Sequence, residues 1–304
     1  MTDFVDLLEN DQQEKITKKG DDIHKFIEER RNTVSPFGID ELDEIVTGIH
    51  AHDYVCIGGQ DKIGKSSIAL FFTMQWIKQG KSVVYFTNEQ SKECLKIRLA
   101  SQLLGYNFAN AMEGRLSEDE HSRLVAKTME IESMPLTIID TGEGTNSMTI
   151  KEKYLEHKPD IMIIDNLNQL KSKNTFQKRN ELVKEFVEEV HTICKENPVC
   201  IIVISHLQRE VAKHKYSWPT KDNLAESASI QREVDLVLLL AWPWLEQQSL
   251  PIELRKDTHK EDEYFVIVGA NRNGPTGLAS CAVDIRVGKF SSRRLLWKAN
   301  TSQR

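Results

Sequence analysis

Long hydrophobic runs are missing from this 304-residue sequence, and no uninterrupted apolar stretch approaches the roughly 18 residues that a helix needs to span a bilayer. The amino terminus, MTDFVDLLENDQQEK, has acidic residues where a signal peptide would have a basic start followed by an apolar run. Membrane insertion and export are therefore not expected, and the expected location is the cytoplasm.

The sequence also has few cysteines and no net positive charge. The five cysteines have neither C-x-x-C spacing nor a nearby histidine pair, which argues against a zinc site and favours reduced, mostly buried thiols. The 40 basic residues are outnumbered by 46 acidic ones, so binding to nucleic acid would need a local basic surface. What is present, 39% hydrophobic and 28% charged residues, is typical of a folded globular protein with a sizeable core.

Residues 1–35 form a charge-rich segment that we expect to be a short helical arm. It contains two amphipathic stretches, Phe4–Leu8 and Ile23–Ile27, and the apolar stripe of Ile23, Phe26 and Ile27 needs a surface to cover. That surface is either the rest of this chain or a neighbouring subunit, and the pattern leaves both open. Residues 36–304 are expected to form one larger domain.

Short apolar runs alternate with longer amphipathic segments from Tyr54 to Ser205, which is the pattern of strands alternating with helices. The runs are rich in β-branched and aliphatic residues, as expected for a parallel sheet covered on both faces. After Asp235 strand-like runs follow without a long helix, so neighbouring strands there can pair antiparallel. The prediction is an α/β fold with a mainly parallel twisted sheet flanked by helices. The expected strands are Tyr54–Ile57, Ser82–Thr87, Leu136–Asp140, Ile161–Asp165, Val199–Ser205, Leu236–Ala241, Tyr264–Ala270 and Cys281–Val287, and the expected helices are Lys65–Gln79, Ser91–Leu104, Glu118–Glu132 and Phe176–Lys195.

A phosphate-binding loop is the clearest motif. GQDKIGKS, residues 59–66, fits G-x-x-x-x-G-K-[ST] and lies between an expected strand and an expected helix, as the motif requires. Glycines let the backbone approach the phosphates, where N–H groups and the helix amino terminus favour negative charge. Lys65 would contact the β- and γ-phosphates of ATP, and the Ser66 hydroxyl would hold Mg²⁺. The candidate nucleotide-binding residues of this segment are Gly59, Gln60, Asp61, Lys62, Ile63, Gly64, Lys65, Ser66 and Ser67.

Three further polar residues lie at or just after the carboxyl ends of expected strands. Asp165 would emerge at the carboxyl end of a parallel strand, where ligands bind in open sheets, and would support Mg²⁺ together with Ser66. Glu89 could hold the attacking water, or could be an acidic residue favoured by the dipole of the helix near Ser91. His206 could sense the γ-phosphate through a hydrogen bond, although a lone histidine at a strand end is usually structural.

In this order the segments from about Phe37 to Phe290 resemble the RecA-like motor domain of DnaB-type replicative ring helicases. FGIDELDEIVTGI resembles the segment before the first core strand, FTNEQ places Glu89 where the family has its catalytic glutamate, and IIDNLNQL carries the Walker B aspartate. SHLQRE resembles the strand-end motif that contacts the γ-phosphate, LAESASIQREVDLVLLL the last family motif, and VGANRNGPTG the segment that bears the arginine finger.

The resemblance implies that Arg272 of one subunit enters the ATP site of its neighbour and stabilises charge on the γ-phosphate. A finger that acts in trans requires a head-to-tail interface, and such interfaces close into rings. The family is typically hexameric, and its linker helix corresponds to the arm of this chain. The resemblance further implies that this protein moves 5′ to 3′ on single-stranded DNA. Without the family, Arg272 would be interpreted as a solvated arginine in a hairpin.

The resemblance also places DNA in the pore, against loops that follow Asp165 and His206. Both loops are basic, and Tyr216 and Trp218 add rings that can stack on bases. A solvated charge run is the alternative for either loop. The candidate DNA-binding residues are Lys171, Lys173, Lys178, Arg179, Arg209, Lys213, Lys215 and Lys221.

Three positions depart from the family pattern. Ala270 stands where many relatives have a lysine two residues before the finger, which leaves one cation there. Ala225-Glu226-Ser227-Ala228 lacks the arginine and the glycine of a DNA-contacting Arg-Glu-Ser-Gly loop. A family glutamine near this loop aligns with Arg232, or with Gln231 after a shift of one residue. ATP binding is therefore more strongly indicated than DNA unwinding.

The expected function is that of an ATP-dependent, ring-forming helicase that translocates on single-stranded DNA and unwinds forked duplex DNA during replication. One alternative is a RecA-like recombinase-type ATPase that coats DNA, and another is a non-motor paralogue that regulates a replisome. Nothing in the sequence matches the family's separate primase-interacting domain, so a separate primase or loader is an expected partner.

Overall fold

The computed structural model describes residues 23–25, 27–28, 30–142, 144–167, 170, 179–208, 218–224, 227–248 and 259–293. The chain divides into two compact units, residues 1–34 and 35–304. In the first unit the described residues from 23 to 33 are helical, and Ile23 and Ile27 are 62% and 59% exposed. The second unit contains the sheet, the core and the candidate site.

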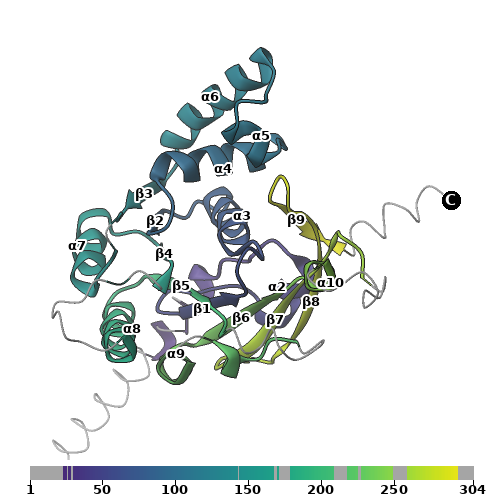
Figure 1. Ribbon diagram of the computed structural model, residues 1–304. Coiled ribbons are helices and arrows are strands. Elements are labelled where there is room, and N and C mark those ends of the chain that lie inside the picture. The colour runs from purple at the N-terminus through teal and green to yellow at the C-terminus, as the bar shows by residue number, and fades with distance from the viewer. Residues whose placement is uncertain are drawn as a thin grey trace, which may run out of the picture. The chain divides into compact units, whose positions relative to one another are not determined.

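One sheet of the second unit holds nine strands, which are β1 Tyr54–Gly59, β2 Val83–Thr87, β3 Leu136–Asp140, β4 Ile161–Asp165, β5 Cys200–His206, β6 Leu236–Ala241, β7 Glu263–Asn271, β8 Gly277–Asp284 and β9 Lys289–Ser292. Their order across the sheet is β3-β2-β4-β5-β1-β6-β7-β8-β9 (Figure 1). The strands from β3 to β6 in that order pair in parallel, and those from β6 to β9 pair antiparallel. The predicted α/β fold with antiparallel carboxyl-terminal strands is confirmed.

The end of the sheet differs from the prediction. The sequence predicts a single strand from Cys281 to Val287, but β8 ends at Asp284 and the chain turns back into β9. Gly288 in this turn has a φ of 69°, in the left-handed region that favours glycine. The turn is closed by the Val287 and Gly288 amides, which donate to the carbonyls of Asp284 and Ile285. Val283, Ile285 and Val287 alternate with polar residues through this short turn, so the apolar pattern does not show where the chain reverses direction.

The four predicted helices are present as α3 Lys65–Lys78, α4 Lys92–Leu104, α6 Glu118–Glu132 and α8 Arg179–Glu196. The predicted start of the last helix at Phe176 lies outside the described residues. Shorter elements were not predicted; they are α2 Asp40–Val46, α5 Phe108–Met112, α7 Ser147–His157, η3 Lys221–Asn223, α9 Ser227–Glu233 and α10 Pro243–Gln248. Among the described residues, none of the helices combines the length and the apolar character needed to cross a membrane.

Alternate side chains of a strand point to opposite faces, so apolar strands give the sheet two apolar faces. Helices cover both of these faces. In β1, Val55 and Ile57 belong to the hydrophobic cluster that includes residues of α2, α3 and α4. The intervening Tyr54 and Cys56 belong to the cluster that includes residues of α7, α8 and α9. The central strands are therefore buried on both sides, as their near-continuous apolar sequences predict.

Four of the five cysteines are buried. Cys56, Cys194, Cys200 and Cys281 are buried, and Cys94 is partly exposed. Burial raises the pKa of the Cys56, Cys194 and Cys281 thiols to about 12, because the thiolate would lose its hydration. These three thiols therefore stay protonated at neutral pH and contribute packing in place of reactivity.

The carboxyl ends of β1, β2, β4 and β5 meet at one edge of the sheet. In the parallel register Gly59 lies beside His206, and Thr87 lies beside Asp165. Residues that follow these four strands are far apart in the sequence, but they converge at this edge. Ligands of open α/β sheets bind in this position.

Candidate active site

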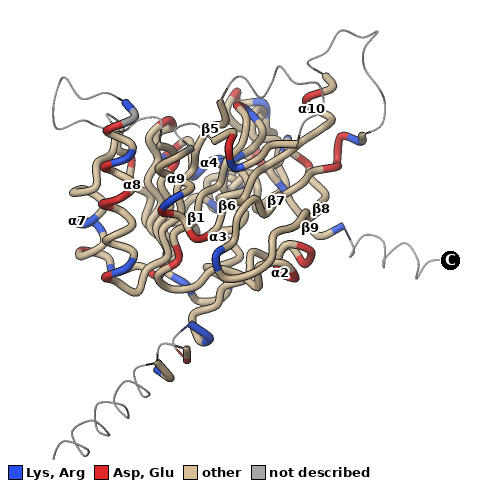
Figure 2. Tube along the Cα trace, turned by 90° about the horizontal axis from the view of Figure 1, so that it is seen from below, with Lys and Arg blue, Asp and Glu red and all other residues tan. Residues whose placement is uncertain are grey.

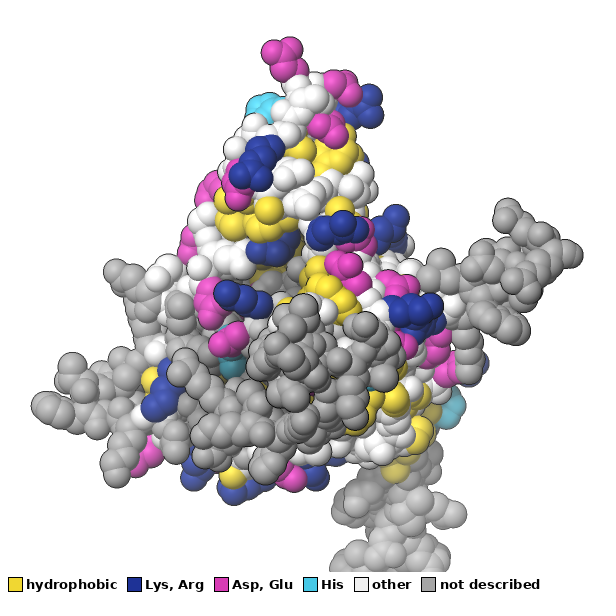
Figure 3. Space-filling model, turned by 45° about the vertical axis from the view of Figure 1, so that its right-hand side comes forward, with side chains coloured by type: hydrophobic (Ala, Val, Ile, Leu, Met, Phe, Trp, Pro, Cys, Tyr) yellow, Lys and Arg dark blue, Asp and Glu magenta, His cyan; other side chains and the backbone are white. Residues whose placement is uncertain are grey.

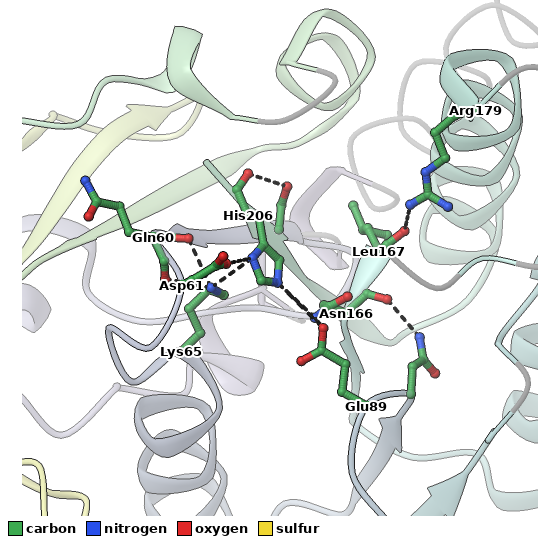
Figure 4. Close-up of polar contacts among 11 residues, drawn as sticks. Gln60, Asp61, Lys65, Glu89, Asn166, Leu167, Arg179 and His206 are labelled. Atoms are coloured by element: carbon green, nitrogen blue, oxygen red, sulfur yellow. Dashed lines mark hydrogen bonds and ion pairs between the residues drawn. The ribbon is translucent and has the colours of Figure 1, made fainter. Parts of the chain in front are cut away.

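The loop between β1 and α3 wraps around the side chain of its own lysine. Lys65 Nζ donates to the carbonyls of Gly59 at 3.1 Å and Gln60 at 2.8 Å (Figure 4). Gly64, with a φ of 98°, precedes the first residue of α3, and a Cβ there would lie 2.7 Å from Ile285 Cδ1. Glycine is therefore required by both the backbone conformation and the neighbouring turn. The predicted phosphate-binding loop has the strand–loop–helix context that its motif needs.

Lys65 is 7% exposed and lies among three carboxylates. Burial lowers the pKa of its ammonium, and the charges of Asp61, Asp165 and Glu89 oppose that effect. A buried lysine among acidic groups on a phosphate-binding loop is placed to neutralise phosphate oxygens.

Asp165 ends β4 in a buried position at the carboxyl edge, 6% exposed. Tyr85 Oη donates to its Oδ2 at 2.7 Å, and the Ser66 hydroxyl is also hydrogen-bonded to the carboxylate. Burial raises the pKa of Asp165, whereas these hydrogen bonds and the nearby Lys65 lower it. A buried carboxylate in contact with the first hydroxyl of α3 fits Mg²⁺, which proteins usually hold with one or two such groups together with substrate phosphates. The two predicted metal-binding residues thus lie side by side.

Glu89 lies between β2 and α4, with a side chain that is 44% exposed. The N-cap of α4 is Ser91, whose side chain accepts from the Cys94 amide, so Glu89 precedes the cap and lies outside the first helical turn. Its carboxylate instead accepts from Asn166 Nδ2 at 2.7 Å. The position of Glu89 therefore favours a group that faces the site over an acidic residue stabilised by the dipole of α4.

His206, the last residue of β5, contacts both sides of the site (Figure 4). Its Nδ1 pairs with the Asp61 carboxylate and lies 3.5 Å from Lys65 Nζ, and its Nε2 lies 3.1 Å from Asn166 Nδ2. The histidine therefore connects the phosphate-binding loop of β1 with the residue that follows β4. A ligand bound to the loop would therefore contact the imidazole ring of His206.

A cavity of about 560 Å³ lies between these side chains. Four of its lining residues were not among the candidates from the sequence: Gln90, Arg98, Asn166 and Ile285. Asn166 follows Asp165 directly, and this polar neighbour was a signal that could have found it. Arg98 and Ile285 come from α4 and the β8–β9 turn, so only packing brings them here. The candidates that line the cavity are Asp61, Lys62, Gly64, Lys65, Ser66, Ser67, Glu89, Asp165 and His206.

The β8–β9 turn is held against the phosphate-binding loop by α4 and α5. Gln102 Nε2 donates to the Ser67 carbonyl at 3.0 Å and also to the Gly288 carbonyl. The Phe108 amide donates to the Arg286 carbonyl at 3.1 Å. The Arg98 guanidinium lies 3.9 Å from the centre of the Phe108 ring, a cation–π contact, and its Nε donates to Gln90. This packing supplies one wall of the cavity.

Arg272 lies at the opposite edge of the sheet. It follows β7, its guanidinium pairs with Asp235 at 3.2 Å, and the Tyr54 amide at the start of β1 donates to the same carboxylate. The phosphate-binding loop follows the other end of β1, a strand of six residues, so about 20 Å of strand separates the two positions. Arg272 is therefore not part of its own chain's cavity, and its side chain is 47% exposed.

Two of the candidate DNA-binding residues lie in described segments. Arg179 begins α8, and its guanidinium donates to the Leu167 carbonyl just after β4. Lys221 begins η3, and its carbonyl accepts from Gln231 Nε2 at 3.0 Å. Figure 2 shows acidic and basic residues interspersed along α7 and α8. The other candidates lie outside the described residues, and they are Lys171, Lys173, Lys178, Arg209, Lys213 and Lys215.

The charge of Asp61 leads to a testable effect on nucleotide affinity. Its carboxylate lies on the phosphate-binding loop beside Lys65 and His206, where it would repel the phosphates of a nucleotide. Replacing Asp61 with Asn is expected to lower the KM for ATP about three- to tenfold, because one like charge is removed at short range. Steady-state ATPase kinetics and titration with a fluorescent nucleotide would measure this change. An unchanged or higher KM would mean that Asp61 turns away from the phosphates on binding.

Comparison with known proteins agrees with this geometry. The Leifsonia xyli replicative DNA helicase DnaB is 27% identical over 261 residues, which cover 84% of this chain and 55% of that protein. The Bacillus subtilis replicative DNA helicase DnaC is 26% identical over 260 residues, which cover 84% of this chain and 56% of that protein. The chain thus spans little more than half the length of these curated relatives.

Solved structures share the fold. A structure described as an ATPase domain matches with a TM-score of 0.79 at 22% identity, covering 91% of this chain and 98% of its own. A DnaB-like replicative helicase, described together with its interactions with primase, matches with a TM-score of 0.78 at 21% identity, covering 89% of this chain and 65% of its own. Residues 35–292 match the family model described as DnaB-like helicase C terminal domain, and the chain therefore belongs to this family.

Proposed function

We propose that this chain is the motor of an ATP-dependent, ring-forming DNA helicase that moves along single-stranded DNA and unwinds duplex DNA during replication. The observation that carries the proposal is the division of the chemical groups between two edges of one sheet. Lys65, Ser66 and Glu89 converge on the cavity with Asp165 and His206, whereas Arg272 lies at the far edge. A site that uses all of these groups needs a second copy of the chain.

In the proposed reaction a water attacks the γ-phosphorus, the bond to the β,γ-bridging oxygen breaks, and ADP and phosphate leave. Lys65 neutralises β- and γ-phosphate oxygens, and Glu89 accepts a proton from the attacking water. Arg272 of the neighbouring copy stabilises the charge that develops on the transferred group. Mg²⁺, held by Ser66 and Asp165, would neutralise phosphate charge when it is bound with the nucleotide. His206 contacts the γ-phosphate and senses its loss.

The proposed assembly is a head-to-tail ring, typically of six copies in this family. An interface that joins the cavity of one copy to the Arg272 edge of the next is heterologous, and repetition of such an interface closes a ring when the rotation allows it. Exposed apolar residues that a neighbour could cover are Ile23 and Ile27 of the arm, and Met112, Val125 and Met129 of α5 and α6. Figure 3 shows apolar side chains along the upper part of the molecule, which α4, α5 and α6 form. We propose that the arm of one copy packs on a neighbouring copy.

The proposed DNA contacts lie in the segments that follow β4 and β5. These segments begin where β4 and β5 end, at the edge that holds the nucleotide cavity, and Arg179 and Lys221 border their far ends. Basic side chains there would neutralise phosphates of a strand in the pore. The proposed direction is 5′ to 3′, and the proposed location is the cytoplasm of a bacterial or phage-infected cell. A primase is a proposed partner, in line with the primase interactions described for the solved DnaB-like helicase.

A fork-unwinding assay with ATP and Mg²⁺ tests this function. Sedimentation first measures the oligomeric state, for which a ring of about six copies is expected. Single-stranded DNA is expected to stimulate ATP hydrolysis, and a fork with only a 5′ tail is expected to be unwound faster than one with only a 3′ tail. ATP hydrolysis without unwinding of either fork would overturn the helicase proposal. Strand pairing in the same mixture would then indicate a recombinase-type protein, and absence of hydrolysis would indicate a non-motor paralogue.

A further inference from the structure

Asn166 lies between Glu89, which is assigned to the attacking water, and His206, which is assigned to the γ-phosphate. It directly follows β4, is 1% exposed, and has its carboxamide nitrogen 2.7 Å from Glu89 Oε1 and 3.1 Å from His206 Nε2 (Figure 4). A carboxylate such as that of Glu89 can only accept hydrogen bonds, so the amide must face it with its nitrogen. The other proton of the same nitrogen is then available to the histidine ring.

The backbone of Asn166 is held by neighbouring strands. The backbone carbonyl of Asn166 accepts from the Asn88 side chain, through Nδ2, at 2.8 Å. The backbone N–H of Asn88 donates to the Asp165 carbonyl at 2.8 Å. Asn88 is itself 4% exposed, and its Oδ1 accepts from the Thr141 hydroxyl. A chain of hydrogen bonds thus runs across the carboxyl ends of β3, β2 and β4 and ends at the backbone carbonyl of Asn166, the residue whose side chain contacts Glu89 and His206. The position of this side chain is therefore set by rigid elements.

The Asn166 contact also determines which tautomer of His206 fits the site. An imidazole nitrogen that accepts a hydrogen bond carries no proton, so Nε2 must be unprotonated opposite the amide donor. The ring proton then lies on Nδ1, where the Asp61 carboxylate accepts it, and the Lys65 ammonium, 3.5 Å from the same nitrogen, makes only the longer contact. A phosphate oxygen can replace the Asp61 carboxylate as the acceptor at Nδ1 without any change of tautomer.

We propose that Asn166 is a positioning residue, which holds the Glu89 carboxylate and keeps His206 in the tautomer with its proton on Nδ1. This inference rests on the proposed ATP hydrolysis. By donating to Oε1 of Glu89, Asn166 restricts a side chain that is otherwise 44% exposed and leaves the second carboxylate oxygen for the attacking water. Asn166 contacts the proposed catalytic residues, and it is not itself assigned a chemical step.

The first test replaces Asn166 with Ala and measures steady-state ATP hydrolysis. The expected result is a fall in kcat of about 10- to 100-fold, with the KM for ATP and the affinity for a non-hydrolysable ATP analogue within about twofold of wild type. In a chain that already carries Glu89→Gln, the same replacement is expected to cause a much smaller further loss, because the carboxylate that it positions is gone and only its contact with His206 remains. A similar loss in both backgrounds, or a loss of analogue binding, would overturn the proposal in favour of a general structural role.

Asn166→Asp guards against misfolding of the alanine variant, because aspartate keeps the shape and places an acceptor against Glu89. It is expected to lower kcat by at least as much as alanine. The matched control is Asn197→Ala, which removes another hydrogen-bonded side-chain amide outside the cavity; Asn197 Nδ2 donates to the Ile193 carbonyl at 2.7 Å. The control is expected to keep wild-type kinetics. Wild-type kcat in Asn166→Asp would contradict the proposal.

A second readout does not depend on turnover. Nitrogen-15 spectra of labelled histidine, with the His206 signals assigned through His206→Gln, are expected to show a protonated Nδ1 and an unprotonated Nε2 in wild type. Asn166→Ala is expected to shift these signals towards a mixture of tautomers. A wild-type His206 protonated on Nε2 would overturn the inference. A chain with the expected tautomer but without ATP hydrolysis would instead contradict the proposed function.

Discussion

Glu89→Gln is expected to lower ATP turnover by about 10²- to 10⁴-fold, the range by which a positioned general base accelerates a reaction. The amide that replaces the carboxylate cannot accept a proton from water at neutral pH. Nucleotide binding should be retained, because Lys65 and Ser66 remain in place on the loop. Single-turnover hydrolysis and binding of a non-hydrolysable analogue, measured on the same preparation, would separate the two effects.

Glu93→Gln is a suitable control for this experiment. Glu93 lies in the first turn of α4, four residues after Glu89, and its side chain is 63% exposed. Its replacement removes the same charge and should leave turnover within about twofold of wild type. Equal turnover in wild type and Glu89→Gln would contradict the assigned role of Glu89 and would require another base in the cavity.

Arg272→Ala is expected to lower ATP turnover by about 10³-fold or more, as loss of an arginine finger does in other nucleotide hydrolases. Because Arg272 lies at the opposite edge from its own cavity, the loss should be repaired by another chain. Chains with Lys65→Ala have the finger and lack the loop lysine, whereas chains with Arg272→Ala have the reverse. Rings mixed from these two inactive variants should therefore hydrolyse ATP. When mixing is random and equal, about a quarter of the subunit interfaces should pair an intact loop lysine with an intact finger.

Arg123→Ala provides the control, because Arg123 is an exposed arginine paired with Asp119 at 2.9 Å on α6. It should keep wild-type turnover, since an exposed ion pair contributes little to stability. Thermal unfolding of Arg272→Ala would show whether the loss of its contact with Asp235 affects the fold. A mixture that stays inactive, with both variants folded and assembled, would indicate that Arg272 does not complete a neighbouring site.

Much of the core could be predicted because the parallel strands are buried on both faces. Ile161 to Ile164 and Ile201 to Ile204 are uninterrupted apolar runs, and each one became a central strand. The helix Glu118–Glu132 has a capping box between Ser117 and Glu120, and its predicted limits are those observed. Local signals of this kind suffice where burial or capping is strong.

The shorter elements could not be predicted in the same way. In α7 only Ser147, Ile150 and Tyr154 are buried, so this helix lacks a clear apolar stripe. The turn from β8 to β9 depends on contacts of Gln102 and Phe108, which belong to α4 and α5. Packing against distant segments decides such elements, and local sequence carries little information about it.

The sequence by itself identified the loop motif that carries Lys65 and Ser66 and, through the order of its motifs, the family. Only the tertiary structure decided that Asn166 lies between Glu89 and His206, because strand order places β4 between β2 and β5. It also placed Arg272 at the far edge, since β7 runs antiparallel to β6 and ends where β6 begins. Strand order and direction arise from pairing between segments distant in the chain, and the local residue pattern specifies neither.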